Sequence, residues 1–184
     1  MTVTLVRHGE TEWSRTGRHT GRTDVPLCAD GRAGAAALAD RLRGRQFTLV
    51  LTSPLSRARD TAMLAGFPDA VVDDDLMEWD YGDYEGRTTV DIHTTRPGWS
   101  LWLDGVPDGE TIQAVAERAE RLIARARAAD GDALLFGHGH LLRVLASRWI
   151  DTDPSFAARL MLDAATISEL VDDRGTPAVH TWNT

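Results

Sequence analysis

The sequence has 184 residues, of which 42% are hydrophobic and 26% charged, so it fits one globular domain or a small two-lobed unit and not a disordered chain. All 20 basic residues are arginine, which excludes chemistry that needs a lysine, such as a Schiff base or a Walker-type phosphate site. The formal net charge of −8 argues against binding to nucleic acid or to an anionic membrane. A bound anion therefore needs a local pocket that opposes the charge of the whole chain.

Cys28 is the only cysteine, so neither an intrachain disulfide nor a cysteine cluster for a metal can form. The first residues run from a short apolar stretch straight into charge, without the features of a secretory signal. No apolar run approaches the roughly 20 residues that a membrane-spanning helix needs. We therefore expect a soluble, cytoplasmic protein of a reducing compartment.

Apolar runs of strand length alternate with helical patterns along the chain, while residues 7–27 show no helical period. The predicted strands are 3–6, 47–51, 70–72, 132–136, 167–171 and 178–182. The predicted helices are 29–45, 54–65 with Ser53 as its cap, 88–95, 97–104, 109–129 and 140–150. The helix over 29–45 is expected to bury one apolar stripe, made of Ala33, Ala36, Ala37, Leu38 and Leu42.

This alternation predicts an α/β fold, a three-layer α/β/α sandwich with a mostly parallel central sheet, in a single domain over 1–184. The irregular segment 76–108 is rich in Gly, Trp and Asp and is a candidate substrate-capping insertion. Within it, Trp99 and Trp102 fit either the core or an apolar cap over a substrate. The apolar helix near 140–150 fits either the core or an interface, which leaves a homodimer open.

Ligands of such folds bind at the carboxyl ends of the strands, where loops lead into helices. Three of the predicted strands end in the most reactive side chains of the chain, although these lie up to 130 positions apart. We expect the fold to gather them at one point. The three ends are Arg7-His8, Ser53 to Arg57, and Gly137-His138.

The gathered side chains have the chemistry of a phosphoryl site. A neutral His8 is a competent nucleophile, and Arg7 and Arg57 each offer a planar fork that matches phosphate oxygens. His138 would supply a third donor when protonated. The arrangement predicts a clamp for a transferring phosphoryl group.

A phosphohistidine mechanism also needs an acid for the leaving alkoxide and a base for water. Glu78 is the best candidate, because Trp79 and Tyr81 flank it and would desolvate its carboxyl group. On chemistry alone, Asp80 and Asp83 are close rivals.

Four blocks of residues follow one another along nearly the whole chain. They are Arg7-His8-Gly9-Glu10-Thr11; Ser53-Pro54-Leu55-Ser56-Arg57-Ala58 with Thr61; Glu78 ahead of Tyr81-Gly82 and Glu85-Gly86; and Gly137-His138-Gly139. In this order they resemble the histidine phosphatase (phosphoglycerate mutase-like) superfamily, branch 1, of the small phosphatase type. The resemblance implies a phosphorylated His8, a phosphoryl pocket of Arg7, Arg57 and His138, Glu78 as proton donor, and a reaction without metal or cofactor.

The resemblance also suggests where the rest of a substrate would bind. Thr20 and Gly21 belong to a block that would approach the substrate, and Gly139 and His140 would lie at the leaving-group side. Ser14 stands where many relatives have an asparagine, so a hydroxyl replaces a phosphate-contacting amide.

Other positions distinguish this chain within the family. Cys28 replaces the usual Ser or Thr helix cap, which predicts a weaker cap. Residues 107–111 resemble the Gly-Glu-Ser/Thr turn before the long helix. Phosphoglycerate mutases carry a longer insertion with lysine and paired arginines for the substrate carboxylate, whereas residues 79–108 contain only Arg87 and Arg96. The comparison disfavours a mutase and favours a small phosphatase.

Two patterns could suggest a metal. His138 and His140 have the spacing of two zinc ligands, but no further ligand cluster accompanies them, so we expect no metal. The acidic run 73–75 is interpreted as a solvated turn, with a magnesium site as the alternative.

The leading hypothesis is a metal-independent phosphomonoesterase that acts through a phosphohistidine on a small phosphorylated metabolite, with broad specificity as one option. A phosphoglycerate mutase-type phosphotransferase is the second hypothesis. A catalytically silent module that binds phospho-ligands is the third. The expected partner is a small phosphoester, not a nucleic acid or a membrane.

Overall fold

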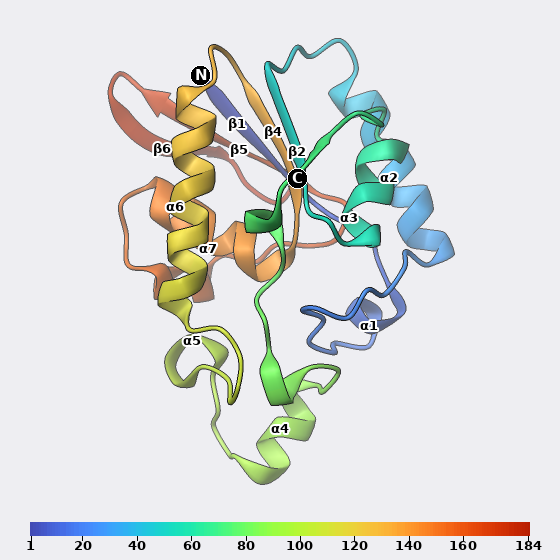
Figure 1. Cartoon of the computed structure of the whole chain (residues 1–184), viewed down its shortest axis with the longest axis vertical. Coiled ribbons are helices and arrows are strands. Elements are labelled where there is room, and N and C mark those ends of the chain that lie inside the picture. The colour runs from blue at the N-terminus through green and yellow to red at the C-terminus, as the bar shows by residue number, and fades with distance from the viewer.

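A six-stranded sheet runs through the centre of the protein, which a computed structural model describes over all 184 residues (Figure 1). The strand order is β3-β2-β4-β1-β5-β6. β1 to β4 are mutually parallel, and β5 pairs antiparallel with both β1 and β6. The mostly parallel sheet is confirmed, with bounds β1 (Thr2–Arg7), β2 (Leu49–Thr52), β3 (Val71–Val72), β4 (Ala133–Gly137), β5 (Ile167–Asp173) and β6 (Thr176–Thr181).

Helices cover both faces of the sheet, and alternate residues of β4 pack against the helices of each face. Leu134 and Phe136 pack in one apolar cluster with α2 (Ala29–Leu42) and α3 (Ser56–Leu64). Ala133 and Leu135 point to the other face, into a larger cluster with α6 (Ile112–Ala128) and α7 (Gly139–Trp149). Successive strand residues face opposite sides, so a strand buried on both sides is apolar throughout. The predicted three-layer sandwich is confirmed.

The segment between β3 and α6 extends past the carboxyl ends of the strands (Figure 1). It contains η1 (Asp74–Leu76), η2 (Gly82–Tyr84), α4 (Thr89–Thr95) and α5 (Leu101–Asp104). Trp99 is 5% exposed and lies in the larger core cluster, against which the half-buried Trp102 packs. Of the two alternatives for these tryptophans, the structure therefore has the core and not the cap.

Three local expectations are wrong. Ser53 does not cap α3, whose N-cap is Leu55: the Ser53 hydroxyl accepts from the Leu55 N–H and from His138 Nε2–H, and not from an N–H of the helix. The acidic run is not a solvated turn, since Asp73 is buried and Asp75 pairs with Arg121 and Arg125 of α6. The stretch 7–27 contains a short helix, α1 (Glu12–Arg15).

The apolar stripe of α2 is right at its two leucines and wrong at its three alanines. The helix turns Gly31 and Ala35 toward the protein interior instead, and the alanines of the predicted stripe are exposed. Gly31 is the reason, because the loop after β1 packs directly on this glycine. Cys28 is the N-cap of α2, as predicted, and its Sγ accepts from the Gly31 N–H at 3.4 Å.

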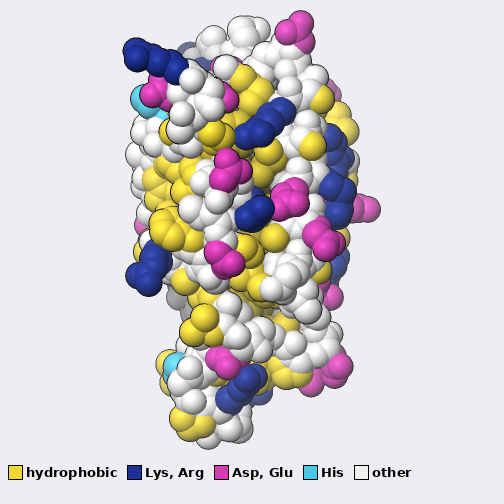
Figure 2. Space-filling view, turned by 90° about the vertical axis from the view of Figure 1, so that its left-hand side faces the viewer, with side chains coloured by type: hydrophobic (Ala, Val, Ile, Leu, Met, Phe, Trp, Pro, Cys, Tyr) yellow, Lys and Arg dark blue, Asp and Glu magenta, His cyan; other side chains and the backbone are white.

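The surface on the side that carries α6 and β6 mixes arginines, acidic side chains and apolar atoms (Figure 2). None of the helices combines the length and the apolarity needed to cross a membrane. The last short helix, η3 (Pro154–Arg159), packs against α7.

Candidate active site

The parallel strands bring the three reactive segments together at one edge of the sheet. The His8 N–H donates to the Gly137 carbonyl at 3.0 Å, and the Ser53 N–H donates to the Phe136 carbonyl at 3.0 Å. The His8 and His138 rings are 5.1 Å apart, centroid to centroid. β1, β4 and β2 are neighbours in the sheet, so their loops meet although they are far apart in sequence.

His8 is held as a neutral imidazole in a defined tautomer. Its Nδ1–H donates to the Gly9 carbonyl at 2.6 Å, which leaves the lone pair of Nε2 free. Burial, together with the positive charges of Arg57 and Arg7, holds the pKa of His8 well below its usual value. The Gly9 N–H donates to the Thr61 hydroxyl at 3.0 Å and fixes the turn. The result is an unprotonated nitrogen at the end of a buried strand.

Arg57 and His138 lie behind His8 and bond to the protein. The Arg57 Nε–H donates to His138 Nδ1 at 3.2 Å, and His138 Nε2–H donates to the Ser53 hydroxyl at 2.8 Å. His138 is therefore neutral, and burial and the Arg57 charge lower its pKa. The two terminal nitrogens of Arg57 donate to the carbonyls of Thr20, Gly21 and Thr23. The expectation of a protonated His138 donor does not fit this bonding.

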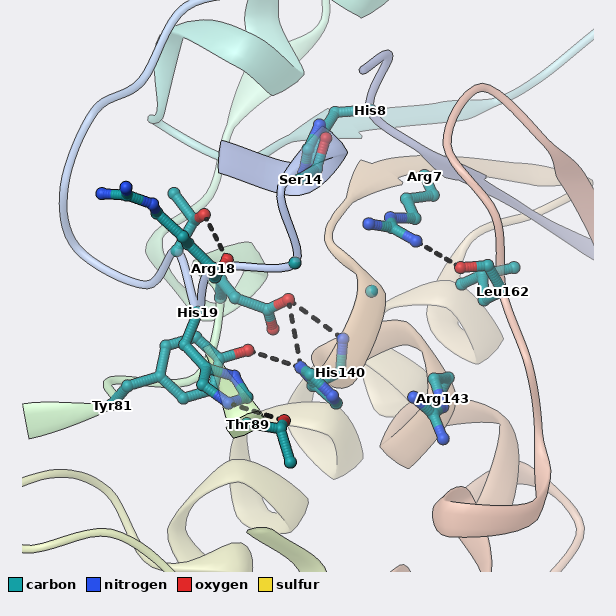
Figure 3. Close-up of a pocket in the computed structure, with 14 residues that line it drawn as sticks. Arg7, His8, Ser14, Arg18, His19, Tyr81, Thr89, His140, Arg143 and Leu162 are labelled. Carbon is teal, nitrogen blue, oxygen red and sulfur yellow. Dashed lines mark hydrogen bonds and ion pairs between the residues drawn. The ribbon is translucent and has the colours of Figure 1, made fainter. Parts of the chain in front are cut away.

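A pocket of about 250 Å3 opens in front of His8 (Figure 3). Arg7 lines it, and the Arg7 NH1 group donates to the Leu162 carbonyl. The buried Nε of Arg7 has no hydrogen-bond partner in the protein. NH1 is the only nitrogen of this guanidinium group that bonds to the protein, so Arg7 keeps donors for an anion in the pocket that it lines.

Glu78 lines the same pocket and is 5% exposed. Its Oε1 accepts from the N–H groups of Trp79 and Leu141, both at 2.9 Å, and its Oε2 accepts from the His140 N–H at 3.0 Å. Two of these donors belong to the first turn of α7, which places the Glu78 carboxyl group at the N-terminus of that helix. The rivals Asp80 and Asp83 do not line the pocket.

Four of the five predicted substrate contacts line the pocket, namely Ser14, Thr20, Gly139 and His140. Gly21 does not, because it is packed under the pocket floor, where a Cβ would lie 2.4 Å from the Trp79 carbonyl oxygen. The Ser14 hydroxyl is partly engaged, since it accepts from the Thr11 N–H and donates to the Thr11 carbonyl within the α1 capping box.

Sequence reasoning predicted His140 but missed Tyr81 and His19, which form an aromatic and imidazole wall of the pocket with it. Tyr81 and His140 share a hydrogen bond between the hydroxyl and Nδ1, and the His19 ring lies 4.9 Å from the Tyr81 ring (Figure 3). Burial lowers the pKa of His19 to about 4, so this imidazole is also neutral. His19 adjoins the predicted contact Thr20, and that proximity was the available signal.

Further missed residues lie around the rim: Arg18, Thr89, Arg143 and Leu162. Arg143 follows His140 by one helical turn of α7, which is a signal the sequence did contain. Its Nε donates to the Ala157 carbonyl at 2.9 Å, and burial lowers its pKa to about 10. The Cζ atom of its guanidinium group lies 4.6 Å from the centroid of the Trp102 ring, and this contact helps to hold Arg143 in place.

The structure contains no cluster of three or more His, Cys, Asp or Glu side chains arranged to hold a metal ion. His138 and His140 do not converge on a shared ligand position. The two nitrogens of His138 bond to Arg57 and Ser53, and His140 Nδ1 bonds to Tyr81.

Comparison with known proteins identifies the family. The model of the histidine phosphatase superfamily (branch 1) matches residues 3–184, so the chain belongs to this superfamily. It is 41% identical over 168 residues to an acid phosphatase of Mycobacterium tuberculosis (strain ATCC 25618 / H37Rv), covering 89% of this chain and 82% of that protein.

Other relatives include phosphatases and mutase-like proteins. Sedoheptulose 1,7-bisphosphatase of Saccharomyces cerevisiae is 38% identical over 79% of this chain and 66% of the yeast protein. The probable phosphoglycerate mutase GpmB of Enterobacter sp. (strain 638) is 33% identical over 92% of this chain and 84% of that protein. The solved structure of an open reading frame of Mycobacterium tuberculosis superposes with a TM-score of 0.95 at 36% identity, covering 99% of this chain and 96% of that one.

Proposed function

We propose that the protein is a phosphomonoesterase that works through a phosphohistidine at His8. The observation that carries the proposal is that a neutral His8, whose Nε2 lone pair is free, lines one pocket with Arg7, whose guanidinium group bonds to the protein through NH1 alone. Neutral imidazole attacks phosphorus, and a guanidinium fork stabilises the charge on the phosphoryl oxygens. Relatives that are phosphatases support the same class of reaction.

The proposed reaction has two steps. In the first, Nε2 of His8 forms a bond to phosphorus, the ester P–O bond breaks, and the protonated Glu78 carboxyl gives its proton to the leaving alkoxide. In the second, the Glu78 carboxylate takes a proton from water, whose oxygen attacks phosphorus as the N–P bond breaks. Inorganic phosphate leaves and the enzyme returns to its starting state. Arg57 adds positive charge from behind His8, and His138 orders its guanidinium.

The expected substrate is a small phosphoester with hydroxyl groups. The pocket wall of neutral His19, His140 and Tyr81 presents hydrogen-bond donors and acceptors without net charge. A sugar phosphate fits such a wall, and the yeast relative is a sugar bisphosphatase by name. A panel of sugar phosphates, phosphoglycerates, nucleotides and phosphopeptides, ranked by kcat/KM, tests this expectation.

The central test is phosphate release by wild type and His8→Ala in the presence of EDTA. We expect wild type to remain active with the chelator. His8→Ala removes the nucleophile and should lower kcat by about 1,000-fold or more. His180→Asn, at an exposed position, is the control and should match wild type. Strict metal dependence, or full activity of H8A, would contradict the mechanism.

The two alternatives are separated by product analysis. Incubation with 3-phosphoglycerate and a bisphosphoglycerate primer yields the isomer from a mutase and inorganic phosphate from a phosphatase. Rapid quenching of a single turnover traps a phosphorylated His8 in either enzyme, and its absence would favour a silent binding module.

A further inference from the structure

We propose that Glu110 and Arg118 form a positioning pair that holds the Glu78 carboxyl at the leaving-group side of the pocket. The inference rests on the acid and base role proposed for Glu78. Neither side chain lines the pocket, so both act through the backbone that carries Glu78.

Arg118 holds the chain just before Glu78. Its NH1 group donates to the carbonyls of Asp75 at 2.7 Å and Met77 at 2.8 Å. The rest of its fork donates to Glu110, from Nε at 2.9 Å and from NH2 at 2.8 Å. Every nitrogen of this guanidinium group is therefore engaged, and the side chain is only 11% exposed.

Glu110 holds the chain just after Glu78. Its Oε2 accepts from the Asp80 N–H at 2.9 Å, and its carbonyl accepts from the Trp79 indole N–H at 2.9 Å. The Glu110 N–H donates to the Asp80 carbonyl at 2.9 Å. The neighbouring Gly109 permits this approach, because a Cβ there would lie 2.3 Å from the Asp80 carbonyl oxygen.

The pair thus holds the chain on both sides of Glu78 within six residues, 75 to 80, and ties that stretch to the N-terminal half of α6. The Glu78 carboxyl is bound at its other end by the first turn of α7. A proton donor must stay within hydrogen-bond reach of the leaving oxygen, and a shift of about 1 Å is enough to cost about 100-fold in rate. If the stretch 75–80 were loosely held, the rate of proton transfer from Glu78 would fall while the phosphoryl pocket stayed in place.

Leaving-group dependence distinguishes positioning from general stability. p-Nitrophenyl phosphate releases a weakly basic phenolate that needs little protonation, whereas glycerol 2-phosphate releases a strongly basic alkoxide that needs a proton from the acid. We expect R118M and E110A to lose at least tenfold more kcat/KM on glycerol 2-phosphate than on p-nitrophenyl phosphate. The ratio kcat/KM reports formation of the phosphohistidine and not its hydrolysis, in which Glu78 acts as base for both substrates. E110Q retains a carbonyl oxygen that can accept the Asp80 N–H and should recover part of the loss.

Arg121→Met is the matched control. Arg121 lies one turn further along α6 and pairs with the Asp75 carboxyl, but it makes no bond to the backbone around Glu78. R121M should lower kcat/KM equally, if at all, on both substrates. Thermal unfolding shows which variants are folded, and R118K carries the test if R118M does not fold.

Glu78→Gln separates failure of the inference from failure of the proposed function. If E78Q loses kcat/KM equally on both substrates, Glu78 is not the acid and the proposed role falls together with its positioning. If E78Q is selective for the better leaving group but every folded variant of Glu110 and Arg118 loses both activities equally, the positioning inference is overturned.

Discussion

Arg7 and Arg57 carry the same guanidinium group but use it differently. Arg57 donates hydrogen bonds to three loop carbonyls and to His138, so it joins the loop over 20–23 to His138, which lies beside His8. Arg7 keeps a buried Nε without a partner beside Glu78 and His8. Since only its NH1 group bonds to the protein, Arg7 keeps guanidinium donors for an anion in the pocket, so phosphoryl binding should depend most directly on this residue.

Arg7→Lys tests this dependence. A lysine keeps the positive charge but cannot reproduce a planar fork, so we expect kcat/KM to fall about 100-fold, or about 2.7 kcal/mol in transition-state stabilisation. The measurement is steady-state hydrolysis with circular dichroism to confirm folding. Arg59→Lys, at an exposed position of α3, is the control and should match wild type. Equal activity of R7K and R59K would show that charge alone suffices.

At the scale of elements, the loop that carries His8 packs on the start of α2 through two facing glycines. A Cβ at Gly9 would lie 2.3 Å from the Gly31 carbonyl oxygen, and a Cβ at Gly31 would lie 1.9 Å from the Glu10 carbonyl oxygen. No side chain fits either position without movement of the backbone. The contact couples the position of the nucleophile to that of a whole helix.

Gly31→Ala should therefore destabilise the protein by about 3 kcal/mol and also reduce activity, because the backbone next to His8 must shift. Gly34→Ala adds the same methyl group to the same helix, where the nearest atom is the Ala165 Cβ at 3.2 Å. The control should stay within about 1 kcal/mol of wild type, since alanine favours the helix. Urea unfolding measures both, and a G31A as stable as G34A would contradict the close contact.

The difference between local sequence patterns and contacts across the fold explains what the sequence could predict. Apolar runs of strand length and the residues directly after them are local features, so the sandwich and the meeting of His8 with His138 followed from pattern and topology. The bond of Tyr81 to His140 and the bracket of Arg118 around Glu78 join segments 41 to 59 positions apart. Such contacts depend on how side chains pack, and no periodicity encodes them.

At the scale of the whole molecule, the absence of lysine leaves arginine to serve both surface and site. On the face shown in Figure 2, arginines lie among acidic side chains, on a chain whose formal net charge is −8. The buried site reverses that balance, because Arg7 and Arg57 lie beside His8, His138 and a single carboxylate, Glu78. Burial, and after it the neighbouring positive charges, keeps His8 and His138 neutral, and the proposed function assigns a phosphate group to this positive site.

That arrangement makes the stability of the fold sensitive to acid. His8, His19, His138 and His140 all have a pKa below the usual value, chiefly because burial disfavours the imidazolium. In the unfolded chain these side chains take up protons near pH 6.5, whereas the native state does not. The unfolded state then binds more protons, so stability is full above pH 6.5 and falls as the pH drops below it.

Urea unfolding between pH 7.5 and pH 5.5 isolates this effect, because Asp and Glu titrate mainly at lower pH in the unfolded chain. We expect the free energy of unfolding to fall by up to about 1.4 kcal/mol per pH unit for each of the buried imidazoles once the pH is below 6.5. His140→Asn removes one of them and should flatten the pH dependence. His180→Asn, at an exposed position, should leave it as in wild type. A free energy of unfolding that stays constant over this range would contradict the expectation. It would show that the four imidazoles of the folded protein take up protons at the same pH as those of the unfolded chain.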